Sequence, residues 1–285
     1  MSTLARLLIS SRPLSWVNTA LPFAAAYYFG GGGVDIALIA ISLFFLVPYN
    51  LLMYGINDVF DYESDLRNPR KGGVEGGLLP PELHRPMLIW AGLISLPPAL
   101  IIFFSATPNA GASAVFLVTI FAVIAYSVRG LRFKEIPFLD SITSSIHFVG
   151  PMLFGLLLVA DLSPGMWLAT IAFFSWGAAS HAFGAVQDVR ADRAGGINSI
   201  ATEIGARATV RLAFFLYVLA AALLAMLPGR FAFATIAAIP YLLVTLREWN
   251  ITDDTCELAH RGWRRFLLWN FIAGAIVASL LIGPL

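Results

Sequence analysis

Residues 34–65 read VDIALIAISLFFLVPYNLLMYGINDVFDYESD, and this stretch decides the fold class. Its apolar part, Val34–Tyr54, is long enough for a helix to cross a lipid bilayer, which takes about 20 residues. The run of acids at Asn57–Asp65 follows where such a helix would leave the hydrocarbon. Acidic groups near hydrocarbon are costly, so their presence here predicts a function for them.

The acids of this stretch lie on one face of the predicted helix. Asp58, Asp61 and Asp65 are spaced at i, i+3 and i+7, whereas Glu63 faces away. Carboxylates arranged in this way repel one another unless a cation lies between them. Hard oxygen ligands favour Mg²⁺. We therefore expect a magnesium site, and the alternative is a solvated helix end with ordinary capping acids.

A second acidic motif follows another apolar run, Gly165–Gln187. Asp188 and Asp192 are spaced at i and i+4, which again places both carboxylates on one helical face. For this motif alone, a solvated helix end is again the alternative. The repetition predicts that two aspartate clusters grip one magnesium–diphosphate.

The composition places the whole chain in a lipid bilayer. Of its 285 residues, 59% are hydrophobic and 12% are charged, whereas soluble domains carry roughly 25% charged residues. The net charge of +1 gives no indication of a nucleic-acid partner, and none is expected. The single cysteine, Cys256, excludes an intramolecular disulfide and a cysteine-based metal site.

The apolar runs predict nine transmembrane helices in a single domain, residues 1–285. The expected spans are Leu14–Phe29, Val34–Tyr54, Met87–Ser105, Ala110–Ser127, Ile136–Ala160, Gly165–Gln187, Ala208–Leu227, Phe231–Leu246 and Phe266–Ile282. Because no convincing cleavage site follows the basic N-terminal residues, we expect the first apolar run to be retained as a span rather than removed as a signal peptide.

The basic residues predict the orientation of these spans. All but one of the 18 lysines and arginines fall on the side that holds the N-terminus and both acidic motifs, and the exception is Arg230. The positive-inside rule therefore predicts a multi-pass protein of the cell membrane with its N-terminus and motif loops in the cytoplasm. Both motifs share that face, as binding to one ligand requires.

Basic residues near the motifs are candidates for binding the diphosphate. Arg132 and Lys134 follow the fourth span on the motif side, where an arginine can grip phosphate oxygens in a fork and a lysine supplies a point charge. Simple anchoring at the cytoplasmic face is the alternative for each. Further candidates of this kind are Arg67, Arg70, Lys71 and Arg193.

Polar residues within the spans are candidates for chemistry. Tyr54 lies four residues before Asp58, and His181 lies seven before Asp188, so we expect each one or two turns deeper on the metal-facing side. Asp140 and His147 lie on the fifth expected span. Each of these residues could act as a base or dipole near a developing carbocation, or could be a hydrogen-bonded packing residue.

Together, these motifs resemble those of the UbiA superfamily of intramembrane prenyltransferases. The resemblance covers nearly the whole chain and rests on N-D-x-x-D-x-x-x-D at Asn57–Asp65, on Tyr-Ser…Arg-x-Lys at Tyr126–Lys134 and on D-x-x-x-D at Asp188–Asp192. Gly196 stands where many members have a further aspartate, so metal binding by the second cluster would use fewer carboxylates.

The resemblance implies an all-α integral membrane bundle of nine helices around a central cavity with a cytoplasmic cap. The implied Mg²⁺ ligands are Asp58, Asp61, Asp65, Asp188 and Asp192, with Asn57 and the basic residues at the diphosphate. Tyr126 and Tyr54 are implied to join Arg132, Lys134 and His181 in catalysis.

Two stretches, Tyr54–Gly76 and His181–Asp188, look like the lycopene elongase branch of this superfamily. That branch implies transfer of a dimethylallyl group from dimethylallyl diphosphate to the terminal double bond of lycopene through an allylic carbocation. A carotenoid cyclase is a possible partner, and the sequence does not decide whether one acts alongside the enzyme. Three alternatives stay open. A related enzyme could prenylate an aromatic quinone or haem precursor, a transporter would be expected to carry its carboxylates near the bilayer midplane, and a non-catalytic partner protein would be expected to lack the aspartates.

Overall fold

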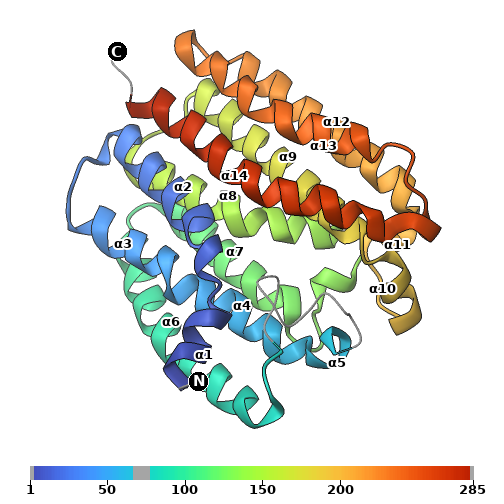
Figure 1. Cartoon of the computed structure of the whole chain (residues 1–285). Coiled ribbons are helices and arrows are strands. Elements are labelled where there is room, and N and C mark those ends of the chain that lie inside the picture. Colours follow the sequence, from blue (N-terminus) through green and yellow to red (C-terminus); the bar gives the residue numbers. More distant parts are fainter. Residues whose placement is uncertain (1–2, 67–77, 283–285) are drawn as a thin grey trace. The chain divides into compact units, whose positions relative to one another are not determined.

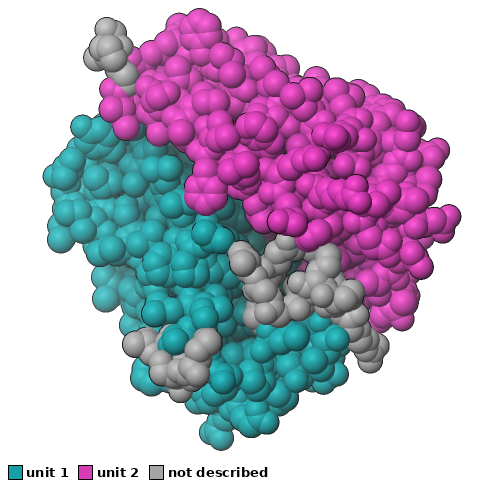
Figure 2. All heavy atoms as spheres, in the orientation of Figure 1, with its two compact units in different colours: residues 1–133, 147–161 teal, residues 134–146, 162–285 magenta. Residues whose placement is uncertain are grey.

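The structure, a computed structural model, describes residues 3–66 and 78–282 of the chain. All regular structure in these two ranges is helical, as the sequence predicts (Figure 1). The helices form two compact units, which Figure 2 colours separately. Unit 1 covers Met1–Phe133 and His147–Asp161, and unit 2 covers Lys134–Ile146 and Leu162–Leu285.

The described part of unit 1 holds the first acidic motif. Its elements are α1 (Thr3–Ser10), the 3-10 helix η1 (Pro13–Ser15), α2 (Val17–Tyr27), the π-helix η2 (Tyr28–Gly32), α3 (Ile36–Leu46), α4 (Pro48–Phe60), α5 (Tyr62–Asp65), the 3-10 helix η3 (Pro81–Leu83), α6 (His84–Ala106) and α7 (Ala110–Ser127).

Unit 2 holds the second motif. The 3-10 helix η4 (Phe133–Glu135) lies at the division, and α8 (Leu139–Val159) gives its first part to unit 2 and the rest to unit 1. The further elements are α9 (Pro164–Val186), α10 (Val189–Gly195), α11 (Ile200–Ile204), α12 (Ala206–Ala225), the 3-10 helix η5 (Gly229–Ala238), α13 (Ile239–Arg247), the 3-10 helix η6 (Asp253–Leu258) and α14 (Ala259–Ile282).

The span expected at Val34–Tyr54 is split into two successive helices, α3 and α4. Proline has no backbone N–H, and Pro48 begins α4 just after α3 ends. The side-chain amide of Asn50, which is fully buried, donates to the carbonyl of Phe45 at 2.8 Å and to that of Leu46 at 3.0 Å. The side chain of Asn50 therefore satisfies carbonyl groups that the break in the helix leaves without backbone donors, which explains why a polar residue is buried within the span.

The helix that carries the first acidic motif ends inside the motif. Asp61 is the C-cap residue of α4, and the single turn α5 follows. The backbone N–H of Asp65 still donates to the carbonyl of Asp61 at 2.8 Å, so the helical path continues. Asp58, Asp61 and Asp65 are buried and Glu63 is exposed, which confirms the faces predicted from the spacing.

The core of unit 1 contains a cluster of phenylalanines, and a glycine lets two of the helices of this unit approach closely. The rings of the cluster have centroids 4.9 to 6.3 Å apart and belong to Phe23, Phe45, Phe116 and Phe154. A Cβ atom on Gly150 of α8 would lie 2.1 Å from Oγ1 of Thr119 on α7. Only a glycine permits this approach, as is common where helices pack in membranes.

In unit 2, the first part of α8 and α12 both pack against α9. A Cβ atom on Gly177 of α9 would lie 2.5 Å from Oγ of Ser145 on α8, and the hydroxyl of Ser145 donates to the carbonyl of Phe174 at 2.7 Å. The hydroxyls of Ser180 and Tyr217 lie 3.1 Å apart between α9 and α12. Small residues and paired hydroxyls thus join helices whose other side chains are apolar.

Seven helical segments of the described residues are long and apolar enough to cross a membrane, judged by length and composition. They are Ile36–Phe60, Pro81–Ala106, Ala110–Ser127, Leu139–Val159, Ala206–Ala225, Gly229–Arg247 and Asp253–Ile282. The first expected span, Leu14–Phe29, is divided among η1, α2 and η2. Helix α9 has 23 residues but is not among the seven. The count of nine, the central cavity, the cytoplasmic cap and the single domain therefore stay predictions.

Candidate active site

The carboxylates of the first acidic motif are buried at the end of α4. The side chain of Asp58 is 0% exposed and that of Asp61 is 5% exposed. The side-chain amide of Asn57 donates to Oδ2 of Asp61 and, at 3.1 Å, to the hydroxyl of Ser127, the last residue of α7. Buried carboxylates require such donors and cations, so the motif is joined to the end of α7.

Arg132, predicted to bind the diphosphate, lies beside this motif. Its Nη2 is 3.8 Å from Oδ1 of Asp61, and its Nη1 donates to the carbonyl of Phe60 at 3.3 Å. The chain turns back after α7 because Gly130 adopts a φ of 94° and Arg132 itself a φ of 43°. A guanidinium in this position can contact an anion that the carboxylates hold through a cation.

A second cation at the motif comes from the N-terminal segment, and no motif in the sequence marks it as part of the site. Nη2 of Arg12 donates to Oδ1 of Asp58 at 2.7 Å, and its guanidinium carbon lies 4.6 Å from the centre of the Tyr54 ring. Burial lowers the pKa of Arg12, but the charge of Asp58 and its hydrogen bond outweigh this effect, so the pKa is raised and the guanidinium stays charged. The only sequence signal for Arg12 is a basic residue before the first apolar run.

Tyr126, predicted to take part in catalysis, packs against His147. Their rings meet edge to face with centroids 5.2 Å apart. His147 is buried, and its backbone carbonyl accepts a hydrogen bond from the hydroxyl of Tyr49 at 3.0 Å. His147 thus packs against two tyrosines of unit 1, and a catalytic role for Tyr126 stays a prediction.

The second acidic motif lies at the start of α10. Asp188 is the residue before this helix, and the backbone N–H of Asp192 donates to the carbonyl of Asp188 at 2.8 Å. The i, i+4 spacing therefore spans one helical turn, as predicted, and both side chains are half-buried. Because α9 ends at Val186, before α10 begins, the helical spacing that predicts the position of His181 relative to Asp188 does not extend to Asp188.

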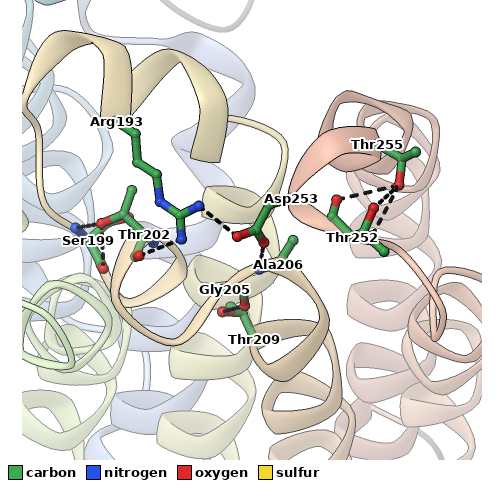
Figure 3. A network of polar contacts seen from close by, with 9 residues as sticks. All are labelled: Arg193, Ser199, Thr202, Gly205, Ala206, Thr209, Thr252, Asp253 and Thr255. Carbon is green, nitrogen blue, oxygen red and sulfur yellow. Dashed lines mark hydrogen bonds and ion pairs between the residues drawn. The ribbon is translucent and has the colours of Figure 1, made fainter.

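Arg193 belongs to a network of polar contacts that joins α10 to α11, α12 and η6 (Figure 3). Its Nη1 donates to Oδ2 of Asp253 at 2.6 Å, and its Nη2 donates to the carbonyl of Thr202 at 2.9 Å. Oδ1 of Asp253 accepts the backbone N–H of Ala206 at 2.7 Å. Protein groups therefore hold the guanidinium of Arg193, and its contact with a diphosphate stays a prediction.

His181 and Asp140 meet through Ser141 in unit 2. Nδ1 of His181 lies 3.0 Å from Oγ of Ser141. The carboxylate of Asp140 is fully buried and accepts the backbone N–H groups of Ser141 at 2.6 Å and Ile200 at 2.7 Å. Asp140 therefore joins the start of α8 to α11, which is a structural role, and His181 is the stronger candidate for proton transfer.

The donor chemistry of both motifs fits Mg²⁺, because aspartate oxygens are the hard ligands that this cation prefers. Within residues 3–66 and 78–282, no group of three or more His, Cys, Asp or Glu side chains gathers as a ready metal site. Among the predicted phosphate ligands, Lys134 lies in η4 and is half-buried. Three others lie outside the described residues, namely Arg67, Arg70 and Lys71.

Comparison with known proteins places these motifs in a family. The model of the UbiA prenyltransferase family matches residues 19–281. The chain is 50% identical over 285 residues to a lycopene elongase/hydratase of Corynebacterium glutamicum, covering 99% of this chain and 98% of that protein. It is also 50% identical over 281 residues to the C(50) beta-cyclic carotenoids biosynthesis protein LbtBC of Dietzia sp., with 98% of this chain and 65% of that protein covered.

Solved structures show the same fold. A UbiA homologue from Archaeoglobus fulgidus, solved with bound DMAPP and Mg²⁺, aligns with a TM-score of 0.67 at 19% identity and covers 95% of this chain and 99% of that chain. This likeness agrees with the all-helical architecture predicted from the apolar runs. The chain therefore belongs to the UbiA prenyltransferase family, and it is a multi-pass membrane enzyme that transfers prenyl groups.

Proposed function

We propose that this enzyme transfers a dimethylallyl group from dimethylallyl diphosphate to the terminal double bond of lycopene, in a reaction that depends on Mg²⁺. The observation that carries the proposal is the 50% identity, over 99% of the chain, to a lycopene elongase/hydratase. The buried carboxylates of Asp58 and Asp61, with the guanidinium of Arg132 beside them, supply a physical basis for binding a metal–diphosphate.

Each part of the proposed site has a distinct task. Mg²⁺ would be held by the aspartates of both motifs, which are Asp58, Asp61, Asp65, Asp188 and Asp192. When bound, Mg²⁺ neutralises the diphosphate and makes it a better leaving group. Arg132 contacts the diphosphate oxygens in a fork and stabilises the charge that builds on them, and Lys134 adds a point charge. Further contacts are assigned to Asn57, Arg67, Arg70, Lys71 and Arg193.

The chemistry divides into three steps. The C1–O bond of the donor breaks, and its electron pair leaves with the diphosphate, so an allylic cation remains. The π electrons of the terminal double bond of the acceptor then form the new C–C bond and leave a tertiary cation. That cation loses a proton to a base, a role that we assign to His181, or it captures water and the resulting oxonium loses a proton to leave a hydroxyl group. The apolar helices exclude bulk water while the allylic cation exists, because water would quench it. Tyr54 and Tyr126 are assigned to the lining of the site.

The decisive experiment is pigment analysis by mass spectrometry in a lycopene-producing host that expresses the chain. The wild type should convert lycopene into products that are larger by one or two five-carbon units. Asp58→Asn should abolish this conversion, whereas Glu63→Gln, which changes an exposed acid of the same motif, should not. Unchanged lycopene in membranes that contain the folded protein would overturn the lycopene assignment and lead to tests of aromatic acceptors. A carotenoid cyclase partner stays a prediction.

We further propose that the protein lies in the cell membrane with its N-terminus and both motifs facing the cytoplasm, as the basic residues predict. Replacing Cys256 by serine provides a cysteine-free background. A membrane-impermeant maleimide applied to intact cells should then label Pro228→Cys, on the side of Arg230, and should not label Ala191→Cys on α10. The reverse pattern would invert the assigned orientation.

A further inference from the structure

The first acidic motif holds an internal cation that the proposed mechanism does not use. Arg12 donates to Oδ1 of Asp58 at 2.7 Å, and the two side chains are 17% and 0% exposed. The guanidinium also lies over the ring of Tyr54, four residues before Asp58 on α4, at 4.6 Å from its centre. The attraction between the charges of Arg12 and Asp58 is strong, because little water is present to screen it.

The local backbone around Arg12 is built to present this side chain. Arg12 adopts a φ of 50°, a left-handed conformation that is unfavourable for residues other than glycine. It is held there from both sides, since the hydroxyl of Ser11 donates to the carbonyl of Leu8 at 2.6 Å and Nε1 of Trp16 donates to the carbonyl of Ser11 at 3.1 Å. Strained backbone that neighbouring bonds determine in this way is typical of functional segments.

We infer that Arg12 is a built-in counter-ion of Asp58 and competes with the divalent cation for that carboxylate, an inference that rests on the proposed role of Asp58 in binding Mg²⁺. A bound Mg²⁺ lies about 2.0–2.1 Å from its ligand oxygens, and a guanidinium nitrogen lies 2.7 Å from Oδ1 of Asp58. Two cations so close in a buried site repel one another. Metal binding at Asp58 therefore displaces Arg12 together with the N-terminal segment that carries it.

This exchange predicts an order of binding. A divalent cation alone must break the ion pair between Arg12 and Asp58 and leaves the guanidinium without its counter-charge, which is unfavourable. A cation that arrives with a diphosphate brings negative charge that offsets the displaced guanidinium. The wild-type protein should therefore bind the bare metal weakly and bind metal and diphosphate with strong positive coupling, and that coupling depends on Arg12.

The test measures Mn²⁺ affinity of the purified full chain, without turnover, by electron paramagnetic resonance. The probe is Mn²⁺ alone or Mn²⁺ with the unreactive analogue dimethylallyl thiolodiphosphate. We expect Arg12→Gln to bind Mn²⁺ alone at least about tenfold more tightly than the wild type, with a smaller gain on adding the analogue. Arg12→Lys keeps the charge and should remain near the wild-type affinity. Arg6→Gln on the same N-terminal segment is the matched control and should leave it unchanged.

Unchanged or weaker Mn²⁺ binding by Arg12→Gln would overturn the inference. Asp58→Asn separates this failure from failure of the proposed function. If Asp58→Asn binds Mn²⁺ as the wild type does, Asp58 is not a metal ligand and the proposed site itself fails. If Asp58→Asn loses Mn²⁺ binding while Arg12→Gln gains none, only the competition is wrong.

A second measurement retains Arg12 and does not depend on the stability of its variants. Ser10, at the end of α1, is buried, so Ser10→Cys in a Cys256→Ser background should react slowly with a maleimide. Mn²⁺ with the analogue should raise the labelling rate several-fold as the segment leaves Asp58. No change in labelling at saturating Mn²⁺ and analogue would overturn the displacement.

Discussion

Replacing Asp253 should loosen the helix that carries the second acidic motif. Oδ1 of Asp253 accepts the backbone N–H of Ala206 at 2.7 Å, and Oδ2 accepts Nη1 of Arg193 at 2.6 Å. Gly205 precedes α12 and has no side chain to cap it, so Asp253 supplies from η6 the acceptor that an N-cap residue usually supplies. Gly205 has a φ of 80°, and a Cβ there would lie 3.2 Å from Oδ1 of Asp253, so this arrangement depends on glycine.

The size of the effect follows from these two contacts. Loss of a helix cap costs about 1 kcal/mol, and loss of an exposed ion pair costs about 0.2–1 kcal/mol. The side chains of Arg193 and Asp253 are 45% and 38% exposed, so the ion pair belongs in the lower part of that range. We expect Asp253→Ala to lower the free energy of unfolding by about 1.5 kcal/mol. Asp253→Asn keeps an acceptor for Ala206 and should lose only about 0.5 kcal/mol.

The assay is equilibrium unfolding in detergent micelles, followed by circular dichroism, for both Asp253 variants and for Arg193→Gln. Arg193→Gln removes the ion pair and keeps the cap, so its loss of stability should be smaller than that of Asp253→Ala. Because Asp192 lies on α10, the Mg²⁺ concentration for half-maximal activity should rise more for Asp253→Ala than for Asp253→Asn, while the rate at saturating Mg²⁺ changes less. Equal stability of Asp253→Ala and Asp253→Asn would refute the capping role.

Three further predictions test the site and the packing. Arg132→Gln should lower kcat by about 100-fold or more, measured as product formation from labelled donor, because it removes a cation from the leaving group. Arg129 is exposed, and Arg129→Gln should leave kcat nearly unchanged. Similar losses in both variants would contradict a specific role for Arg132. Gly150→Ala should destabilise the fold by about 1–3 kcal/mol through overpacking. In the control variant Gly92→Ala, the added Cβ would lie 3.8 Å from its nearest neighbour, so thermal unfolding should show unchanged or greater stability. Equal effects of the two substitutions would show that α8 can shift to accommodate the added methyl group. Asn50→Leu should lower the free energy of unfolding by about 1–3 kcal/mol in the same assay, because it removes buried hydrogen bonds. If this variant were as stable as the wild type, the break between α3 and α4 would need no side-chain donor.

Local sequence patterns predict the acidic motifs and most of the spans. The spacing of Asp58, Asp61 and Glu63 predicts their faces correctly because the helical period is a local property of the backbone. The first and sixth expected spans, Leu14–Phe29 and Gly165–Gln187, are not among the seven segments that are long and apolar enough to cross a membrane, so they stay predictions. The sequence predicts a kink at Pro48, between α3 and α4. That the side chain of Asn50 donates to the carbonyls at this kink depends on side-chain geometry, which the sequence pattern does not give.

Long-range partners were beyond the reach of these patterns. Arg12 and Asp58 are 46 positions apart, and Arg193 and Asp253 are 60 apart. Spacing does not specify which distant side chains meet, because that depends on how helices pack. The positive-inside rule accounts for both arginines without assigning either a partner.

The amino-acid sequence is enough to predict a helical membrane protein with two aspartate motifs, because hydrophobic length and helical period are local properties that act within a few turns of chain. The enzyme class follows from the likeness of those motifs to the UbiA family. Three pairings become visible only in the folded chain: Asp140 accepts backbone N–H groups, Arg12 neutralises Asp58, and Asp253 caps α12. Each of these pairings satisfies a charged or polar group that folding has buried or left uncapped. The need for a partner follows from the residue type, but the partner's identity is set by packing.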